Sequence, residues 1–239
     1  MEDKIKSILK ELKAHAPFTL FGAFTGIICM LLFKNFGKEM NLRLFQVFHP
    51  AHVVLSAMVT SALFTLYKKK TSFIAVLIVG YVGAIGVATL SDCVLPFFGE
   101  SILGVAVPVH SHSDEHTSEE GEEHAQTELH QDEDEGPKIH LGFIEDWYIV
   151  NPAAILGVLI AYFLPRTKFP HAGHVLISTW ASSFHVLMNT QRELTPLILT
   201  GMLIVLFIAV WLPCCVSDII FPLLFVKSRE DLSHIHHHH

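Results

Sequence analysis

Long apolar runs, separated by short polar or charged breaks, constrain this chain more than any other feature of its sequence. Hydrophobic residues make up 51% of its 239 positions and charged residues only 16%. Because lipid cannot hydrogen bond to the backbone, a chain that crosses a bilayer in apolar runs must do so as helices. We therefore predict an all-α integral membrane protein rather than a soluble domain. Its six predicted transmembrane helices cover residues 17–33, 44–67, 71–92, 149–164, 170–189 and 196–225.

Four further segments are predicted to differ from membrane spans. Residues 1–15 place lysines around an apolar stripe, which predicts an amphipathic interfacial helix. Residues 96–109 are apolar but too few to span and are broken by proline and glycine, which predicts a re-entrant or interfacial tail. Residues 110–142 are histidine-rich, acidic and predicted to be disordered, and 228–239 are a tail ending in a purification-tag remnant. The predicted division is 1–15, 16–109 (first repeat with its tail), 110–142, 143–227 (second repeat) and 228–239.

A phrase that occurs twice indicates that the spans are duplicated. Residues 48–56 read FHPAHVVLS and residues 169–178 read FPHAGHVLIS, and about 40 residues after each copy comes a second shared phrase. That phrase reads SDCVLPFF from Ser91 and SDIIFPLL from Ser217. Six spans then divide into two three-helix repeats, and an odd number of spans per repeat gives the two halves inverted topology. Because Lys and Arg are more numerous on the side of the N-terminus, we expect both termini in the cytoplasm and the histidine-rich loop outside.

Each repeat is predicted to gather histidines and an aspartate at one end of its spans. Histidines three residues apart share one helix face, and the next span returns an aspartate to the same depth. The first set is expected at the outer face and the second at the inner face. Neutral imidazoles and carboxylates suit zinc and other first-row divalent ions, with Glu100, Cys93 or Cys215 as further candidate ligands. The predicted metal ligands are His49, His52, Asp92, His171, His174 and Asp218.

Further polar residues outline a predicted transport path and a metal-capturing loop. The fifth span carries a stripe of polar side chains at helical spacing, which should face the bundle interior, and His185 on it is also a candidate proton relay. The predicted path comprises Ser56, Ser178, Ser182, His185, Asn189 and Glu100. Histidines among carboxylates favour weak transition-metal binding, and this loop resembles in composition the histidine-rich loops of several zinc transporter families. The loop histidines are His110, His112, His116, His124, His130 and His140.

These patterns leave three functions open. The first is a permease for a divalent transition metal, with zinc expected first, working by alternating access of the inverted repeat and coupled to protons. The second is a zinc-dependent intramembrane hydrolase, because the histidines, aspartate and serine resemble in type those of the alkaline ceramidase and adiponectin receptor enzymes. The third is a metal-sensing channel. The histidine–aspartate pairs could also serve only to pin helix ends. Metal ion and lipid bilayer are the expected partners, a homo-oligomer is left open, and nucleic acid is not expected.

Overall fold

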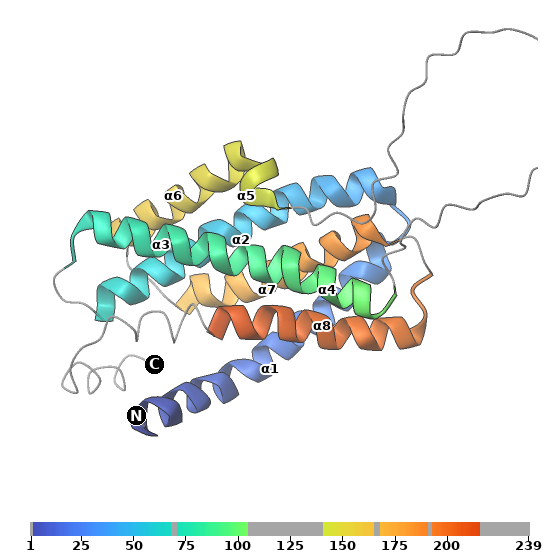
Figure 1. Cartoon of the computed structure of the whole chain (residues 1–239), viewed down its shortest axis with the longest axis horizontal. Coiled ribbons are helices and arrows are strands. Elements are labelled where there is room, and N and C mark those ends of the chain that lie inside the picture. Colours follow the sequence, from blue (N-terminus) through green and yellow to red (C-terminus); the bar gives the residue numbers. More distant parts are fainter. Residues whose placement is uncertain (1, 68–70, 105–140, 165–167, 191–192, 216–239) are drawn as a thin grey trace, which may run out of the picture.

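The computed structural model describes residues 2–67, 71–104, 141–164, 168–190 and 193–215, and the side chains of most of these. Every regular element in these ranges is helical. In order they are α1 (Glu2–Phe33), α2 (Gly37–Tyr67), α3 (Phe73–Ala88), the π-helical turn η1 (Thr89–Val94), α4 (Leu95–Ile102), α5 (Gly142–Glu145), α6 (Trp147–Phe163), α7 (Lys168–Asn189) and α8 (Pro196–Cys215). Figure 1 shows most of the helices laid along the long axis of the molecule, with α1 crossing them obliquely.

The structure supports the predicted class of helical membrane protein. Within the described residues, four helical segments are long and apolar enough to cross a membrane: His15–Phe33, Gly37–Leu66, Phe73–Ile102 and Pro196–Cys214. Helix α6 is apolar but shorter, and α7 has the length but carries too many polar residues to qualify by hydropathy. Six membrane spans and an inverted repeat therefore stay predictions.

Two predicted breaks are absent from the described helices. Helix α1 continues through Pro17, so the segment predicted as a separate interfacial helix is joined without interruption to the first span. The tail predicted from residue 96 begins inside a continuous helix, because α3, η1 and α4 follow one another without a gap from Phe73 to Ile102. Pro96 fits within this run since it lies in the first turn of α4, where a missing N–H is tolerated. Residues 105–109 lie outside the described ranges.

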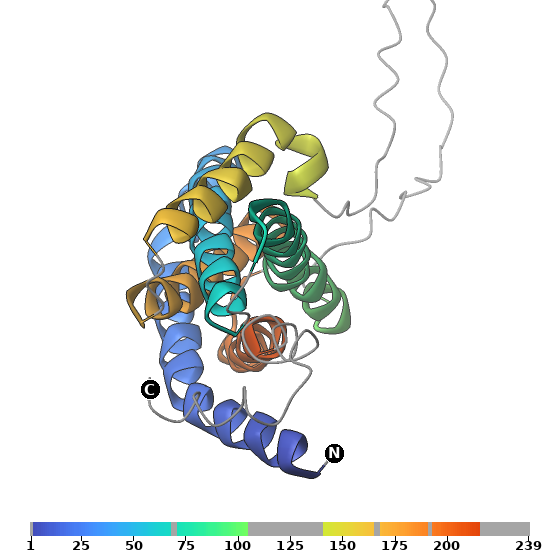
Figure 2. The ribbon, with the colours of Figure 1, turned by 90° about the vertical axis from the view of Figure 1, so that its left-hand side faces the viewer.

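Helices α2 and α7 form the centre of the bundle. Helix α2 packs on α3, α6 and α7, while α7 packs on α1, α2, α8 and η1. Figure 2, which looks along the bundle, shows α6 lying toward its periphery and α1 passing outside α8. Small residues allow close approach, because a Cβ added at Gly157 of α6 would lie 2.3 Å from the Val54 carbonyl oxygen of α2.

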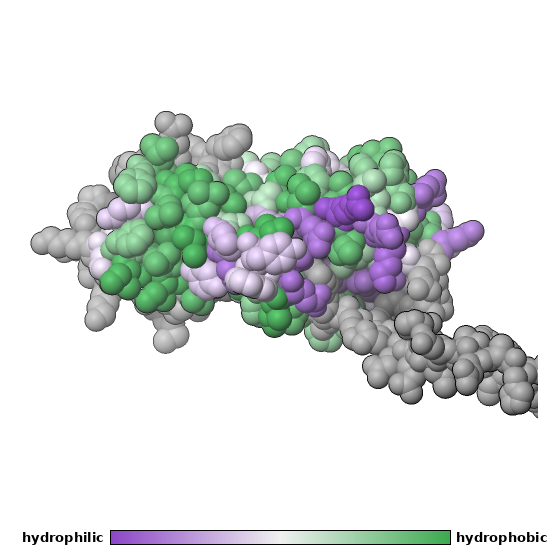
Figure 3. All heavy atoms as spheres, turned by 90° about the horizontal axis from the view of Figure 1, so that it is seen from above, coloured by the Kyte–Doolittle hydropathy of each residue, from purple (hydrophilic) through white to green (hydrophobic). Residues whose placement is uncertain are grey.

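The outer surface carries the apolar side chains that a lipid environment requires. Figure 3 shows broad apolar areas on one face, with hydrophilic residues gathered in one part of it. Exposed apolar side chains occur on several helices, including Phe21 and Phe24 on α1, Ile78 on α3 and Ile204 on α8. Conversely, the bundle interior holds many polar residues, which is the distribution expected when lipid replaces water as the outer solvent.

Candidate functional site

A π-helical turn positions the aspartate at the centre of the candidate site. The turn η1 holds Ser91, Asp92 and Cys93, all buried. Its backbone follows the i to i−5 pattern, since the Leu95 N–H donates to the Leu90 carbonyl. The next residue is Pro96, which has no N–H to offer the Ser91 carbonyl in this pattern. The hydroxyl of Ser182 on α7 lies 2.9 Å from that carbonyl and can donate to it instead. The carbonyl that the proline leaves without a backbone donor is therefore bonded to the other half of the chain.

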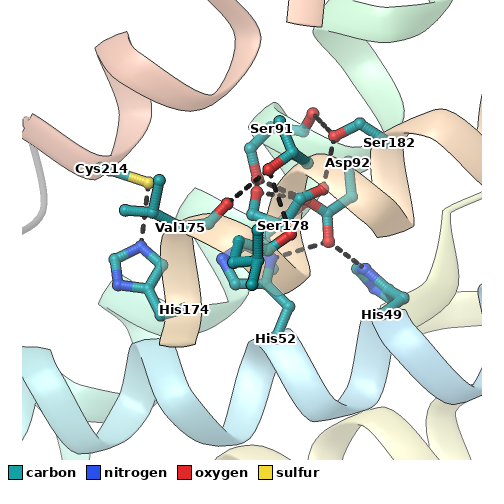
Figure 4. Close-up of polar contacts among 12 residues, drawn as sticks. His49, His52, Ser91, Asp92, His174, Val175, Ser178, Ser182 and Cys214 are labelled. Carbon is teal, nitrogen blue, oxygen red and sulfur yellow. Dashed lines mark hydrogen bonds and ion pairs between the residues drawn. The ribbon is translucent and has the colours of Figure 1, made fainter. Parts of the chain in front are cut away.

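Two imidazoles from α2 bond to one oxygen of Asp92. The Nδ1 atoms of His49 and His52 lie 2.9 Å and 2.7 Å from Asp92 Oδ2 (Figure 4). All three side chains are buried, with exposures of 1% or less. The path of the chain predicts this meeting, because α2 leads away from the two histidines and α3 returns to their depth. The structure places these three side chains together as expected.

Serine hydroxyls occupy the other oxygen of the same carboxylate. Ser91 Oγ and Ser178 Oγ lie 2.7 Å and 2.9 Å from Asp92 Oδ1. The Ser182 hydroxyl lies within hydrogen-bond distance of both the Ser91 and the Ser178 carbonyls and shares its one hydrogen between them. We name these residues the His–Asp–Ser cluster: His49, His52, Ser91, Asp92, Ser178 and Ser182.

The cluster fixes the hydrogen positions on its histidines. With four donors around it, Asp92 is suited to be an ionised carboxylate, which only accepts. The two Nδ1 atoms then donate, and a neutral imidazole that donates through Nδ1 keeps a lone pair on Nε2. The Nε2 atom of His52 is buried and has no hydrogen-bond partner. A carboxylate that orients an imidazole in this way is typical of the outer shell of metal sites.

The second half of the chain adds a histidine to this cluster. The ring of His174 on α7 stacks on that of His52, with centroids 5.3 Å apart, and its Nε2 lies 2.9 Å from Cys214 Sγ on α8 (Figure 4). The prediction placed the two histidine pairs at opposite membrane faces, whereas His52 and His174 are in contact. The reason is that α2 and α7 pack against each other, which brings the rings of His52 and His174 into contact. Two stacked imidazoles cannot both carry a charge without strong repulsion in a buried setting.

A second buried pair lies farther along α7. His185 Nδ1 is 3.2 Å from Glu100 Oε1 of α4, and both side chains are fully buried. Asn189 Nδ2 lies 3.5 Å from His185 Nδ1, at the limit of a hydrogen bond. Phe45 of α2 lies between this pair and the His–Asp–Ser cluster, since its ring stacks on His49 and meets His185 edge to face. The predicted path residues His185, Glu100 and Asn189 are thus neighbours.

The remaining predicted residues divide into buried and undescribed ones. Ser56 is buried with no partner for its hydroxyl. His171 lies on α7, but its side chain, Asp218 and the six loop histidines lie outside what the structure describes. The sequence interpretation missed Ser91, Cys214, Phe45 and Gly142. Ser91 had a signal, because it repeats at Ser217, whereas the others are ordinary residues whose roles depend on packing between distant helices.

Fold and cluster together define an all-helical membrane protein with buried histidine–carboxylate groups between its halves. Within the described ranges, no group of three or more His, Cys, Asp or Glu side chains is arranged to hold a metal ion. The chain matches no protein-family model, no curated protein and no solved structure.

Proposed function

We propose that this protein is a permease for a divalent transition-metal ion, with zinc the expected ion and protons the counter-ion. The observation that carries the proposal is the buried, unpartnered Nε2 of His52, whose imidazole is oriented by Asp92. Neutral imidazole nitrogen is a common zinc ligand. A polar atom without a partner inside a membrane bundle costs free energy and is typical of a functional site. His49, held on the same carboxylate oxygen, supplies a second imidazole.

The proposed transport uses the two halves of the chain in turn. In this proposal the six spans form an inverted repeat, and the halves rock against each other around the polar stripes of α2 and α7. His49 and His52, oriented by Asp92, take the ion on one side, and His171, His174 and Asp218 bind it on the other. His174 already touches His52, which supports a short transfer between the sets. Both termini are proposed to be cytoplasmic, with the loop histidines collecting metal outside.

Protons fit the same chemistry as counter-ion. Metal binding requires a deprotonated imidazole nitrogen, so metal and proton compete for His52 Nε2 and for the imidazole of His49. Acidification of the side that supplies the metal should therefore weaken its uptake. When a proton leaves as the metal ion binds, the net charge of the protein interior changes less, which lowers the electrostatic cost of an occupied site.

Uptake of zinc into proteoliposomes tests this proposal. We expect His52→Ala to abolish uptake and Asp92→Asn to lower the apparent zinc affinity by about 10- to 100-fold, as loss of an outer-shell carboxylate does. The control is Tyr81→Phe, which removes a hydroxyl bonded to Asn151 in the same bundle but outside the cluster, and should leave uptake unchanged. Uptake that survives replacement of His49, His52, His171 and His174 together would overturn the proposal.

A zinc-dependent intramembrane hydrolase is a second candidate, and the contact between His52 and His174 favours it. A hydrolase needs its imidazoles and carboxylate at one place, where a single metal can polarise water, and here histidines of both halves meet beside Asp92. It predicts tightly held zinc without uptake, together with cleavage of a lipid amide that His52→Ala abolishes. Uptake without cleavage would exclude it.

A further inference from the structure

The pair formed by His185 and Glu100 is shielded from solvent within the bundle. Both side chains are fully buried and lie 3.2 Å apart. Each also has a second polar atom, His185 Nε2 and Glu100 Oε2, that is buried without a hydrogen-bond partner. Among the described residues, no hydrogen bond joins this pair to the His–Asp–Ser cluster. An acceptor atom without a partner on each member of a buried histidine–carboxylate pair gives an added proton a place to bind.

The surroundings offer this pair few other charges. Among the described side chains of the neighbouring helices, the buried titratable groups are Cys29 of α1, His49 and His52 of α2, Asp92 and Cys93 of η1, His174 of α7 and Cys214 of α8. The charged residues Lys38, Glu39 and Arg43 of α2 are exposed. Helix α8 carries no acidic or basic side chain. The net charge at this place in the bundle therefore depends mainly on whether the His185–Glu100 pair holds an extra proton.

One proton changes the net charge of the pair from −1 to 0. Without it, neutral His185 donates through Nδ1 to ionised Glu100, and with it the proton resides on His185 Nε2 or Glu100 Oε2. In a low-dielectric interior, a net negative charge attracts a divalent cation at a nearby site and a neutral pair does not. Proton uptake by the pair thus disfavours metal at the His–Asp–Ser cluster, which is the sign that an exchange of the two ions needs.

Phe45 provides the physical link between the two groups. Its ring stacks on His49 with centroids 5.0 Å apart and an interplanar angle of 10°, and its centroid is 5.6 Å from that of His185. Phe45 is itself fully buried, so it cannot turn without disturbing both imidazoles. A shift of His49 when a metal binds would therefore displace the ring that shields His185.

We infer that His185 and Glu100 form a separate proton-binding site, coupled to the His–Asp–Ser cluster through Phe45. The coupling rests on the proposed metal transport, but proton binding does not. As the metal enters, the pair releases its proton, and as the metal leaves, the pair takes one up. Coupling between two sites is typically about 5- to 150-fold in affinity and is reciprocal, so the apparent zinc affinity should change with pH by a factor in this range.

Infrared difference spectroscopy during a pH titration of the detergent-solubilised full chain tests proton binding without metal. We expect wild-type protein to show a carboxyl or imidazole titration step that Glu100→Gln and His185→Gln each remove and that His52→Gln leaves in place. Thermal unfolding of each variant checks that it is folded. If no step is removed by both substitutions in folded protein, no proton binds at the pair and the inference fails, whether or not zinc is transported.

Zinc uptake and zinc-for-zinc exchange in proteoliposomes test the coupling. We expect Glu100→Gln and His185→Gln to lose the acceleration of uptake by a pH gradient, a loss of about tenfold or more. Phe45→Leu should reduce the pH dependence and leave both pairs intact, so that zinc exchange without a gradient persists. Unchanged gradient-driven uptake would overturn the coupling, as would loss of exchange in Phe45→Leu. No zinc movement in wild type, with the infrared step present, would remove the transport proposal and leave the proton site.

Discussion

At the residue scale, Gly142 lies against the imidazole of His49. A Cβ added at this glycine would come within 2.6 Å of both Cδ2 and Nε2 of His49. Real Cβ atoms do not approach so closely, so any larger residue must displace the ring or the backbone. Gly142 begins α5, the first described element after the histidine-rich segment, and α5 is also held by the bond from Gln46 to Asp146, which directly precedes α6. The imidazole of His49 is thereby covered by the chain that follows the histidine-rich segment.

We expect Gly142→Ala to move His49 away from Asp92. The apparent zinc affinity should fall by about tenfold, the lower end for loss of an outer-shell contact, and stability should fall by about 1 to 3 kcal/mol from overpacking. Gly86→Ala is the matched control, because a Cβ there meets nothing within 4 Å and should leave zinc affinity unchanged. Zinc titration and thermal unfolding of both variants measure the difference. Equal zinc affinities in the two variants would show that the ring position does not matter.

Sequence reasoning reached part of this residue-level arrangement. It paired Asp92 with His49 and His52, because two consecutive spans must return to the same depth and the phrase repeats. It placed Ser178 with its own half, although its hydroxyl bonds to Asp92 of the other half. It singled out His185 and Glu100 without pairing them, because residues 85 apart in sequence meet only through the docking of α4 on α7. Such docking depends on side-chain packing, which no local pattern encodes.

At the scale of single elements, the π-helical turn in the third span decides where Asp92 points. A π turn contains one more residue than an α-helical turn, so residues on either side of it face different directions than an unbroken α-helix would give. The sequence interpretation ended the span near Asp92 and treated the prolines and glycines beyond it as a break. The structure instead carries the helix to Ile102, with the irregularity confined to Thr89–Val94. Pro96 is the sequence signal of the π-helical turn, but apolar periodicity alone cannot distinguish a π turn within a helix from the end of that helix.

We expect Pro96→Ala to disturb the cluster without unfolding the protein. The restored N–H can donate to the Asp92 carbonyl four residues back, which favours an ordinary α-helical turn and would rotate the Asp92 side chain away from the histidines. Zinc uptake should fall by about tenfold or more, while the thermal midpoint stays the same or rises. Pro152→Ala in α6 is the control, since that proline lies within a helix distant in sequence from η1. Full uptake by Pro96→Ala would show that the turn does not position Asp92.

At the scale of the whole molecule, the candidate site lies between the two halves of the chain. Helix α2 and η1 supply His49, His52, Ser91 and Asp92, whereas α7 supplies the serines that complete the bonds. The halves approach closely, because a Cβ added at Gly26 of α1 would lie 2.8 Å from Ser183 Oγ of α7. The sequence predicted the helices and the duplication. It did not predict how the two halves dock, because small residues permit close contact with many partners.

We expect the protein to take up zinc when its chain is divided within the histidine-rich segment. Membrane helices can insert separately and then associate, so fragments 1–120 and 121–239 produced together should co-purify and take up zinc. Neither fragment alone should do so, and Ser178→Ala with Ser182→Ala in the second fragment should weaken co-purification. Uptake by the first fragment alone would contradict a site shared between the halves. Co-purification from detergent and proteoliposome uptake provide the two measurements.

The polarity of α7 has a consequence for biosynthesis. Its stripe of histidines and serines makes it too polar to qualify as a span by hydropathy, and its interior bonds are made with the first half of the chain. Ribosomes make that half first, so in the proposed six-span arrangement α2 and η1 are already in the membrane when α7 leaves the translocon. We expect the integration of α7 to depend on contacts with α2 and η1, so a second fragment made alone should be exported or degraded rather than inserted.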